Sequence, residues 1–181
     1  MQKKETFLDL YRYTGDYKLK SWIKYFFFNP GFTYTVFFRI SKSKNTILKI
    51  FSKIMLKILS ILYHFQIPSE VEIKEGFYIG HFGSIVINPK VKIGKNVNIA
   101  QGVTIGQTNR GKLMGTPIIG DEVWIGTNSV IVGKIKIGNN VLIAPNSYVN
   151  RDIPDNSIVF GNPLIIKYNE KATDDYINKK I

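Results

Sequence analysis

An aliphatic residue at every sixth position is the main pattern in the second part of this chain. The period shifts by two residues at Ile85, pauses after Ile105 and resumes at Ile119, and its positions are Ile67, Ile73, Ile79, Ile85, Ile87, Ile93, Ile99, Ile105, Ile119, Ile125, Ile131, Ile137, Ile143 and Val149. A period of six fits neither a helix nor a simple hairpin. It predicts a mainly β, triangular parallel solenoid, in which each short strand turns one aliphatic side chain inward.

A second set of apolar or small residues supports this interpretation. It lies four positions after most of the periodic residues and consists of Val91, Val97, Val103, Val123, Ser129, Ile135, Val141 and Ser147. Glycine, asparagine and aspartate, which suit tight corners, lie between the predicted strands. Stacked coils would then bury a continuous aliphatic column.

Two interruptions of the period mark irregular corners. Ile105 and Ile119 are fourteen residues apart, and residues 106–117 between them (GQTNRGKLMGTP) are polar and rich in glycine. We therefore expect residues 106–117 to protrude as a loop. The two-residue shift at Ile85 follows His81, the one histidine of the predicted solenoid.

The part before the solenoid, residues 1–66, is aromatic and lysine-rich and predicts helices. Residues 6–13, 21–28 and 45–65 have helical patterns, residues 33–40 fit a helix or an extended segment, and Asn29-Pro30-Gly31 signals a turn. Ser43 or Asn45 is the expected N-cap of the longest helix. We divide the chain into a helical segment (1–66), a solenoid (67–166) and a tail (167–181) that forms a short helix or frays.

The longest predicted helix has an unusually wide apolar surface. Lys49, Lys53 and Lys57 recur at every fourth position and form one narrow stripe, which argues against a membrane span. The remaining apolar surface must be covered by the protein itself, by other subunits or by lipid. We favour packing within or between subunits over docking on a membrane surface.

Charge and composition narrow the function classes. The net charge is +12, and residues 1–66 hold 12 Lys and Arg but only three Asp and Glu. This suggests an anionic partner, or simply a solvated basic surface. No nucleic-acid-binding motif is present, so we expect no nucleic acid partner. The chain has no cysteine and two histidines, which excludes disulfides, a thiolate zinc site, a cysteine nucleophile and a multi-histidine metal site.

The N-terminus has no signal-peptide pattern, because no long apolar core or small-residue cleavage site follows its lysines. We therefore expect a cytoplasmic protein, or one peripheral to the inner face of the membrane.

Residues 67–165 resemble the left-handed parallel β-helix of the hexapeptide-repeat acyltransferases. From Gln66 to Pro163 the chain is similar to the serine O-acetyltransferase branch and its carbohydrate-modifying relatives, through GHFGSIVI, IAQGVTIGQT and IPDNSIVFGNP. The resemblance implies a homotrimer with active sites between subunits, acetyl-CoA as co-substrate without a metal, and His81 as general base. A histidine with a pKa near neutrality suits that role.

The chain departs from the serine acetyltransferase pattern where that family binds serine and orients its histidine. The positions that match the family's acidic, arginine and histidine ligands are Gln66, Gly80, Gly115 and Thr116. We therefore predict a carbohydrate acceptor, in a capsule, exopolysaccharide or lipopolysaccharide precursor that is free or lipid-linked. The alternatives are a serine O-acetyltransferase with an altered acceptor pocket and a non-catalytic solenoid scaffold. Gln66, a backbone carbonyl, Glu70, Glu72 or Glu75 would orient His81.

The resemblance also implies where acetyl-CoA binds. The residues expected along its pantetheine arm are Gln107, Thr108, Asn109, Thr127, Ala144 and Pro145. Arg151, Lys134 and Lys167 are candidates for the nucleotide phosphates, and Asn162 and Pro163 close the solenoid near the adenine. Ordinary turn chemistry is the alternative for each of these residues. Trp124 is expected to face outward, at an interface, against the cofactor or on plain surface.

Overall fold

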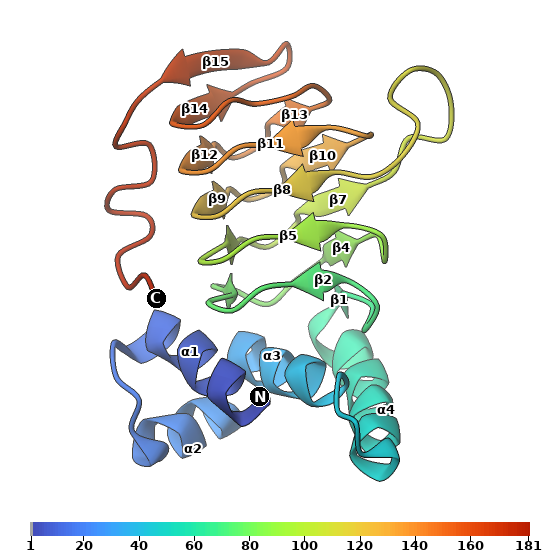
Figure 1. The fold of residues 1–181 in the computed structure, drawn as a ribbon, viewed down its shortest axis with the longest axis vertical. Coiled ribbons are helices and arrows are strands. Elements are labelled where there is room, and N and C mark those ends of the chain that lie inside the picture. Colours follow the sequence, from blue (N-terminus) through green and yellow to red (C-terminus); the bar gives the residue numbers. More distant parts are fainter. Residues whose placement is uncertain (1) are drawn as a thin grey trace.

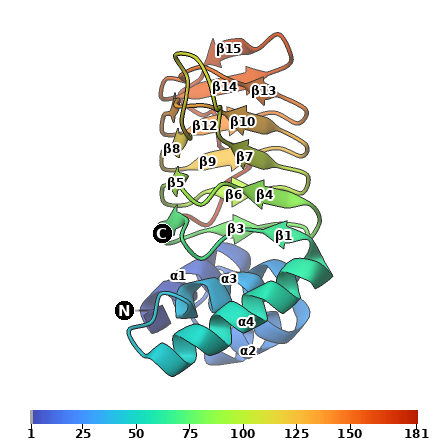
Figure 2. The same ribbon diagram turned by 90° about the vertical axis from the view of Figure 1, so that its right-hand side faces the viewer.

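A computed structural model describes residues 2–181 and shows four helices at one end of a β-solenoid (Figure 1). The helices are α1 (Gln2–Thr14), α2 (Leu19–Phe28), α3 (Pro30–Ile40) and α4 (Thr46–Tyr63). Residues 33–40, for which the sequence left two possibilities, are therefore helical. Figure 2 shows the helices gathered beneath the first coil, at the end opposite β15 (Ile165–Tyr168).

Capping residues set the helix boundaries. Asn29 lies between α2 and α3, and its side chain accepts a hydrogen bond from the backbone N–H of Phe32 at 2.9 Å, while Pro30 takes the first helical position. The predicted turn at residues 29–31 is thus only one residue long. Asn45, rather than Ser43, caps α4. His64 ends α4 in the left-handed conformation (φ 59°).

The strands of the solenoid form three faces. Face A consists of β1 (Phe65–Gln66), β4 (Ile85–Ile87), β7 (Thr104–Gly106), β10 (Val130–Val132) and β13 (Tyr148–Val149). Face B consists of β2 (Glu72–Ile73), β5 (Lys92–Ile93), β8 (Ile118–Ile119) and β11 (Lys136–Ile137). Face C consists of β3 (Tyr78–Ile79), β6 (Asn98–Ile99), β9 (Val123–Ile125), β12 (Val141–Ile143), β14 (Ser157–Phe160) and β15. All described pairs are parallel except β14 with β15.

The six-residue period is confirmed as the core of the solenoid. Of its periodic residues, all are buried except Ile73, which is half-buried at the rim of face B. Equivalent residues stack in register, as Ile79, Ile99 and Ile125 do on face C. The second set is buried as well, and its hydroxyls are satisfied: Ser129 and Ser147 both donate to the carbonyl of Ala144. This continuous column supplies most of the apolar burial of the fold.

Both interruptions of the period lie at corners. Ile79 pairs with Ile99, whereas Ile87 pairs with Ile105, so the corner at residues 80–84 is two residues longer than its neighbour in the next coil. Residues 106–117 protrude as a hairpin closed by paired backbone hydrogen bonds of 3.0 Å between Thr108 and Gly115 (Figure 1).

A buried ion pair fastens the helices to the first coil. Asp9 of α1 and Arg39 of α3 lie 2.7 Å apart with side chains 0% and 4% exposed. The Asp9 carboxylate also accepts the backbone N–H groups of Gly76 and Phe77, at 2.8 and 3.0 Å. Because these contacts join three separate segments, they fix the helical end relative to the solenoid.

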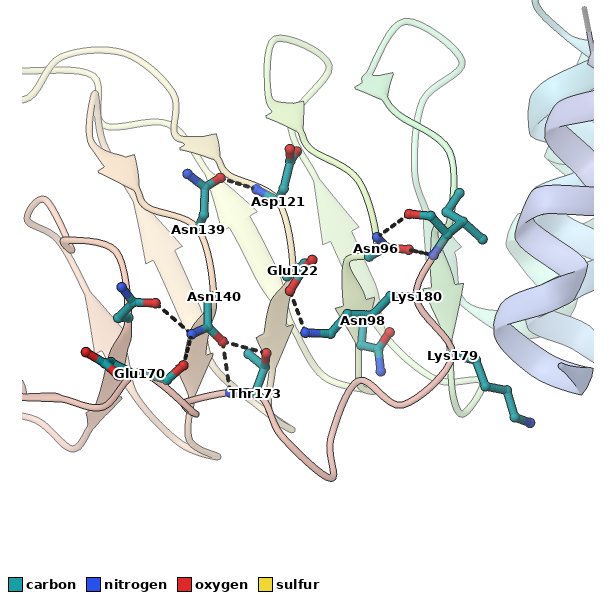
Figure 3. Close-up of polar contacts among 12 residues, drawn as sticks. Asn96, Asn98, Asp121, Glu122, Asn139, Asn140, Glu170, Thr173, Lys179 and Lys180 are labelled. Atoms are coloured by element: carbon teal, nitrogen blue, oxygen red, sulfur yellow. Dashed lines mark hydrogen bonds and ion pairs between the residues drawn. The ribbon is translucent and has the colours of Figure 1, made fainter.

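The C-terminal tail neither forms a helix nor frays, so that prediction is wrong. After β15 it runs back along face C to α1, and Asn140 holds it by accepting from the backbone and hydroxyl of Thr173 (Figure 3). Lys180 pairs with Glu122 at 2.5 Å, and the backbone N–H of Ile181 donates to Asn96. Polar corner side chains of the coils thus hold the tail against the solenoid.

The chain itself leaves most of the apolar surface of the longest helix uncovered, and packing of this surface between subunits stays a prediction. Only Ser52, Leu56 and Leu59 of α4 are buried. None of the described helices is long and apolar enough to cross a membrane.

Candidate active site

His81 lies on the extended corner between faces C and A of the first coil. Its side chain is exposed, and among the described residues it has no hydrogen-bond partner. Gly83, two residues later, has a φ of 138°, which a residue with a Cβ rarely adopts. The N–H of Gly83 donates to the carbonyl of Tyr63 at 3.1 Å, so the corner rests directly on the end of α4.

Strand register places His81 at the foot of a column of corner residues. The pairs Ile99 with Ile125 and Ile125 with Ile143, continued two residues beyond each strand, bring Gln101, Thr127 and Pro145 into line, with Ala144 beside the last. This line stands above the longer corner that carries His81, where Gly83 is the residue that approaches Gln101. Asn162 and Pro163 follow β14 at the top of the same corner, and Lys167 lies on β15 next to it. We call this edge the C–A corner.

The remaining predicted residues lie along a second edge, the A–B corner between faces A and B. Gln107 accepts from the side-chain amide of Asn88 at 3.2 Å and itself donates to Asn109. The hydroxyl of Thr116 donates to the carbonyl of Lys90 at 3.2 Å. The residues on this edge are Gln107, Thr108, Asn109, Gly115, Thr116, Lys134 and Arg151.

Within one chain, therefore, the candidate site is split between the two edges of face A. His81, Gly80 and part of the predicted acetyl-CoA set lie on the C–A corner, and the hairpin lies on the A–B corner. Gln66 is exposed on face A itself, paired with Val86. The structure does not bring these groups together in one cavity of a single chain.

The carboxylates considered as partners of His81 are engaged elsewhere. Glu72 pairs with Lys92 at 3.1 Å on face B, and Glu75 pairs with Lys95 at 2.8 Å beyond that face. Glu70 contacts Lys53 at 3.3 Å, and its pKa is lowered by hydrogen bonds, the first from the Ser69 hydroxyl. None of the three orients His81 within this chain.

Sequence reasoning missed Gln101, which lies in the next coil above the corner that carries His81. Its side-chain carbonyl oxygen is buried without a hydrogen-bond partner, and its Cβ lies 3.2 Å from where a Cβ on Gly83 would be. A buried unpaired oxygen is costly unless something donates to it. The six-residue period places Gln101 at this corner, but it does not distinguish Gln101 from the other polar corner residues.

Trp124 faces outward as predicted, and the tail covers it. Its ring lies 4.7 Å from that of Tyr176. Among the described residues no group of three or more His, Cys, Asp and Glu side chains is arranged to hold a metal ion.

Comparison with known proteins identifies the repeat. Residues 116–151 match the family model described as bacterial transferase hexapeptide (six repeats). Among curated relatives, a serine acetyltransferase of Bacillus pumilus is 34% identical over 112 residues, which cover 61% of this chain and 52% of the relative. One from Staphylococcus epidermidis is 41% identical over 98 residues, covering 54% and 46%. The chain thus spans about half the length of these relatives.

Solved structures agree in fold. A serine acetyltransferase of Entamoeba histolytica in complex with L-cysteine has a TM-score of 0.72 and 26% identity, covering 88% of this chain and 63% of that one. A soybean serine acetyltransferase without ligand has a TM-score of 0.71 and 26% identity, covering 90% and 66%. The chain folds as a left-handed parallel β-helix of hexapeptide repeats, and it is similar to the serine acetyltransferases over about half of their length.

Proposed function

We propose that this chain is an acetyl-CoA-dependent O-acetyltransferase with His81 as its general base. The observation that supports this most is the position of His81, an exposed imidazole on an extended corner at the foot of a column of small and polar corner residues. The relatives that share this solenoid are serine acetyltransferases. A scaffold without activity would not need a histidine at this corner.

The proposed reaction needs one proton carrier. The free imidazole nitrogen of His81 takes the proton of the acceptor hydroxyl as its oxygen attacks the thioester carbonyl. The carbon–sulfur bond then breaks, and the imidazolium returns the proton to the departing CoA sulfur. The products are an O-acetyl ester and the free thiol of CoA, with no acetyl-enzyme, as suits a chain without cysteine. The buried, unpaired carbonyl oxygen of Gln101, on the next coil of the same corner, would accept from the other imidazole nitrogen and hold it as N–H.

The relatives favour L-serine as the acceptor over the carbohydrate predicted from the sequence, because those named here are all serine acetyltransferases. A carbohydrate is the second candidate for the acceptor, and one observation favours it. Gly80, Gly115 and Thr116 offer no charge at the positions where the family pattern implies ligands of the serine zwitterion, and a site without charge partners discriminates poorly for a zwitterion.

Release of free thiol from acetyl-CoA tests the proposal, with L-serine and a panel of sugars and oligosaccharides as acceptors. We expect acceptor-dependent release with one of the two classes. Release with serine would support the activity of the named relatives, and release with glycans alone would support the carbohydrate acceptor. If the protein binds CoA but releases no thiol with any acceptor of either class, the proposed activity is wrong.

We further propose that three copies assemble with face A toward a common threefold axis. The outward residues of face A carry no charge; they are Gln66, Val86, Thr104, Val130, Val132 and Tyr148. Face B carries ion pairs, and the tail covers part of face C. In such a trimer the C–A corner of one subunit meets the A–B corner of the next, so the two halves of the candidate site come together between subunits.

Placing a charge on face A should break this assembly. We expect Val130→Lys to convert a trimer into a monomer in light scattering, because three lysines would gather, desolvated, around the axis. Ile118→Lys is the matched control, since Ile118 is the outward, exposed residue of β8 on face B. If both variants keep the mass of the unmodified protein, face A is not the interface.

A further inference from the structure

The end of the molecule farthest from the tip of the solenoid presents an exposed apolar surface that the proposed function does not use. We call it the helical end face. Its members are outward side chains of α2 and α4, among them Phe28 at 82% and Ile47 at 79% exposure. The set is Leu19, Ile23, Phe27, Phe28, Ile47, Leu48, Ile50, Phe51, Ile54, Ile58, Ile61 and Leu62. This exceeds the scattered single exposures normal for a protein surface.

The two helices are linked to each other through α3. A chain of ring contacts joins them, with centroids 5.2 Å apart between Phe27 and Phe26, 5.7 Å between Phe26 and Phe37, and 6.2 Å between Phe37 and Phe51. Phe37 belongs to α3, which packs between α2 and α4. Figure 2 shows α2 at the end away from the coils and α4 crossing in front, with its C-terminal end rising to β1.

Charge around this surface is predominantly positive, although Glu70 pairs with Lys53 at 3.3 Å. No Asp or Glu occurs between Asp16 and Glu70, whereas the same stretch holds eight lysines and Arg39. On α4 the helical period places Lys49, Lys53 and Lys57 in a stripe between the exposed apolar side and the side packed on the protein. On α2, Lys20 and Lys24 are exposed among the apolar side chains.

We propose that the helical end face docks on a bilayer containing anionic phospholipid, with α2 and α4 lying along its surface. An apolar helix side bordered by lysines is the arrangement that partitions into the lipid interface while its cations meet anionic head groups. A second copy of the same face fits poorly, because a symmetric contact would bring two lysine-rich surfaces with a large excess of positive charge together. This excess of lysines thus favours an anionic surface over a copy of this chain.

Docking in this way would hold the His81 corner near the lipid. α4 ends at Tyr63, whose carbonyl accepts from Gly83 and whose ring lies 6.4 Å from that of Phe82. His81 belongs to the first coil, the coil that rests on the helices. An acceptor held at the membrane would therefore reach this corner more easily than a site at the tip. The docking itself does not depend on the proposed acetyl transfer.

Flotation of the intact protein with vesicles tests the proposal. The vesicles contain phosphatidylcholine alone or phosphatidylcholine with phosphatidylglycerol. We expect the unmodified protein to bind the mixed vesicles. We expect its affinity for them to fall on the order of a hundredfold in K49E/K57E, because each cation near an anionic bilayer contributes severalfold to affinity. K136E/K171E is the matched control, since it makes the same charge change on face B and the tail. F27S/I54S should also lose binding, while I118S/Y168S, equally exposed but outside the helical end face, should retain it.

Three results would overturn the proposal. One is equal binding to neutral and mixed vesicles, and another is equal loss in K49E/K57E and its control. The third is that F27S/I54S lowers the oligomeric mass in lipid-free solution but leaves vesicle binding unchanged, which would assign the face to a second copy. Because thiol release in solution needs no vesicles, failure of docking and failure of the proposed activity are separate outcomes.

Discussion

We expect His81→Ala to lower the rate of acetyl transfer by a factor of about 10²–10⁴, the usual contribution of a positioned general base. The imidazole is exposed at its corner and packs on nothing that the fold needs. Its loss should therefore leave the free energy of unfolding and the binding of CoA unchanged. Free-thiol release under saturating acetyl-CoA measures the rate, and calorimetric titration with CoA measures binding.

The chain supplies its own control in its second histidine. His64 ends α4 with a φ of 59°, a conformation that asparagine tolerates well. We expect His64→Asn to keep most of the activity, although His64 is close to the same corner through its carbonyl, which accepts from Ile85 at 3.1 Å. Full activity in His81→Ala, or equal losses in both variants, would contradict the assigned base.

The solenoid could be predicted from the sequence because its determinants are local and repeated. Each inward aliphatic residue recurs at a fixed interval, so the interval alone predicts that Ile99 and Ile125 are buried in the column. The same arithmetic located the long corner at His81 and the hairpin after Ile105. The corners could be predicted from residue type as well, since Asn128 and Asn146 both adopt the left-handed conformation that asparagine tolerates.

The tail and the helical end could not be predicted in this way, because their contacts join residues far apart in the chain. Thr173 meets Asn140, and Asn98 donates to the carbonyl of Tyr176 at 3.0 Å; no periodicity marks either pair. The pattern of α4 correctly gave a helix with a lysine stripe. It did not show which side of the helix the protein would leave uncovered, since packing of α3 decides that.

The candidate site could be predicted only in part from the sequence, for a related reason. Register within one chain places Thr127 on the same C–A corner as His81, and this follows from the period. Gln107 and Thr116 lie on the opposite edge of face A, and only the arrangement of subunits decides whether they meet His81. The orphan oxygen of Gln101 needed three-dimensional burial to be noticed, because the sequence alone does not distinguish it from other polar corner residues.

The largest effect on stability should come from Arg39. Its guanidinium donates to Asp9 at 2.7 and 3.1 Å and to the carbonyls of Ile73 and Lys74 at 2.5 and 2.7 Å. Burial by itself lowers the pKa of Arg39, but the Asp9 carboxylate more than offsets this, so the pKa is raised and the group stays charged. We expect Arg39→Met to lower the free energy of unfolding by about 3–5 kcal/mol, because the carboxylate stays buried without its partner.

Denaturant unfolding measures this loss, with Lys53→Met as the control. Lys53 and Glu70 also form an ion pair, but their side chains are 45% and 60% exposed, and such a pair contributes at most about 1 kcal/mol. The double variant D9L/R39M should be less destabilised than R39M alone, because it removes the unpaired charge as well as its partner. If R39M lowers the free energy of unfolding no more than K53M does, apolar packing holds the helices to the first coil. The ion pair would then add nothing measurable to stability.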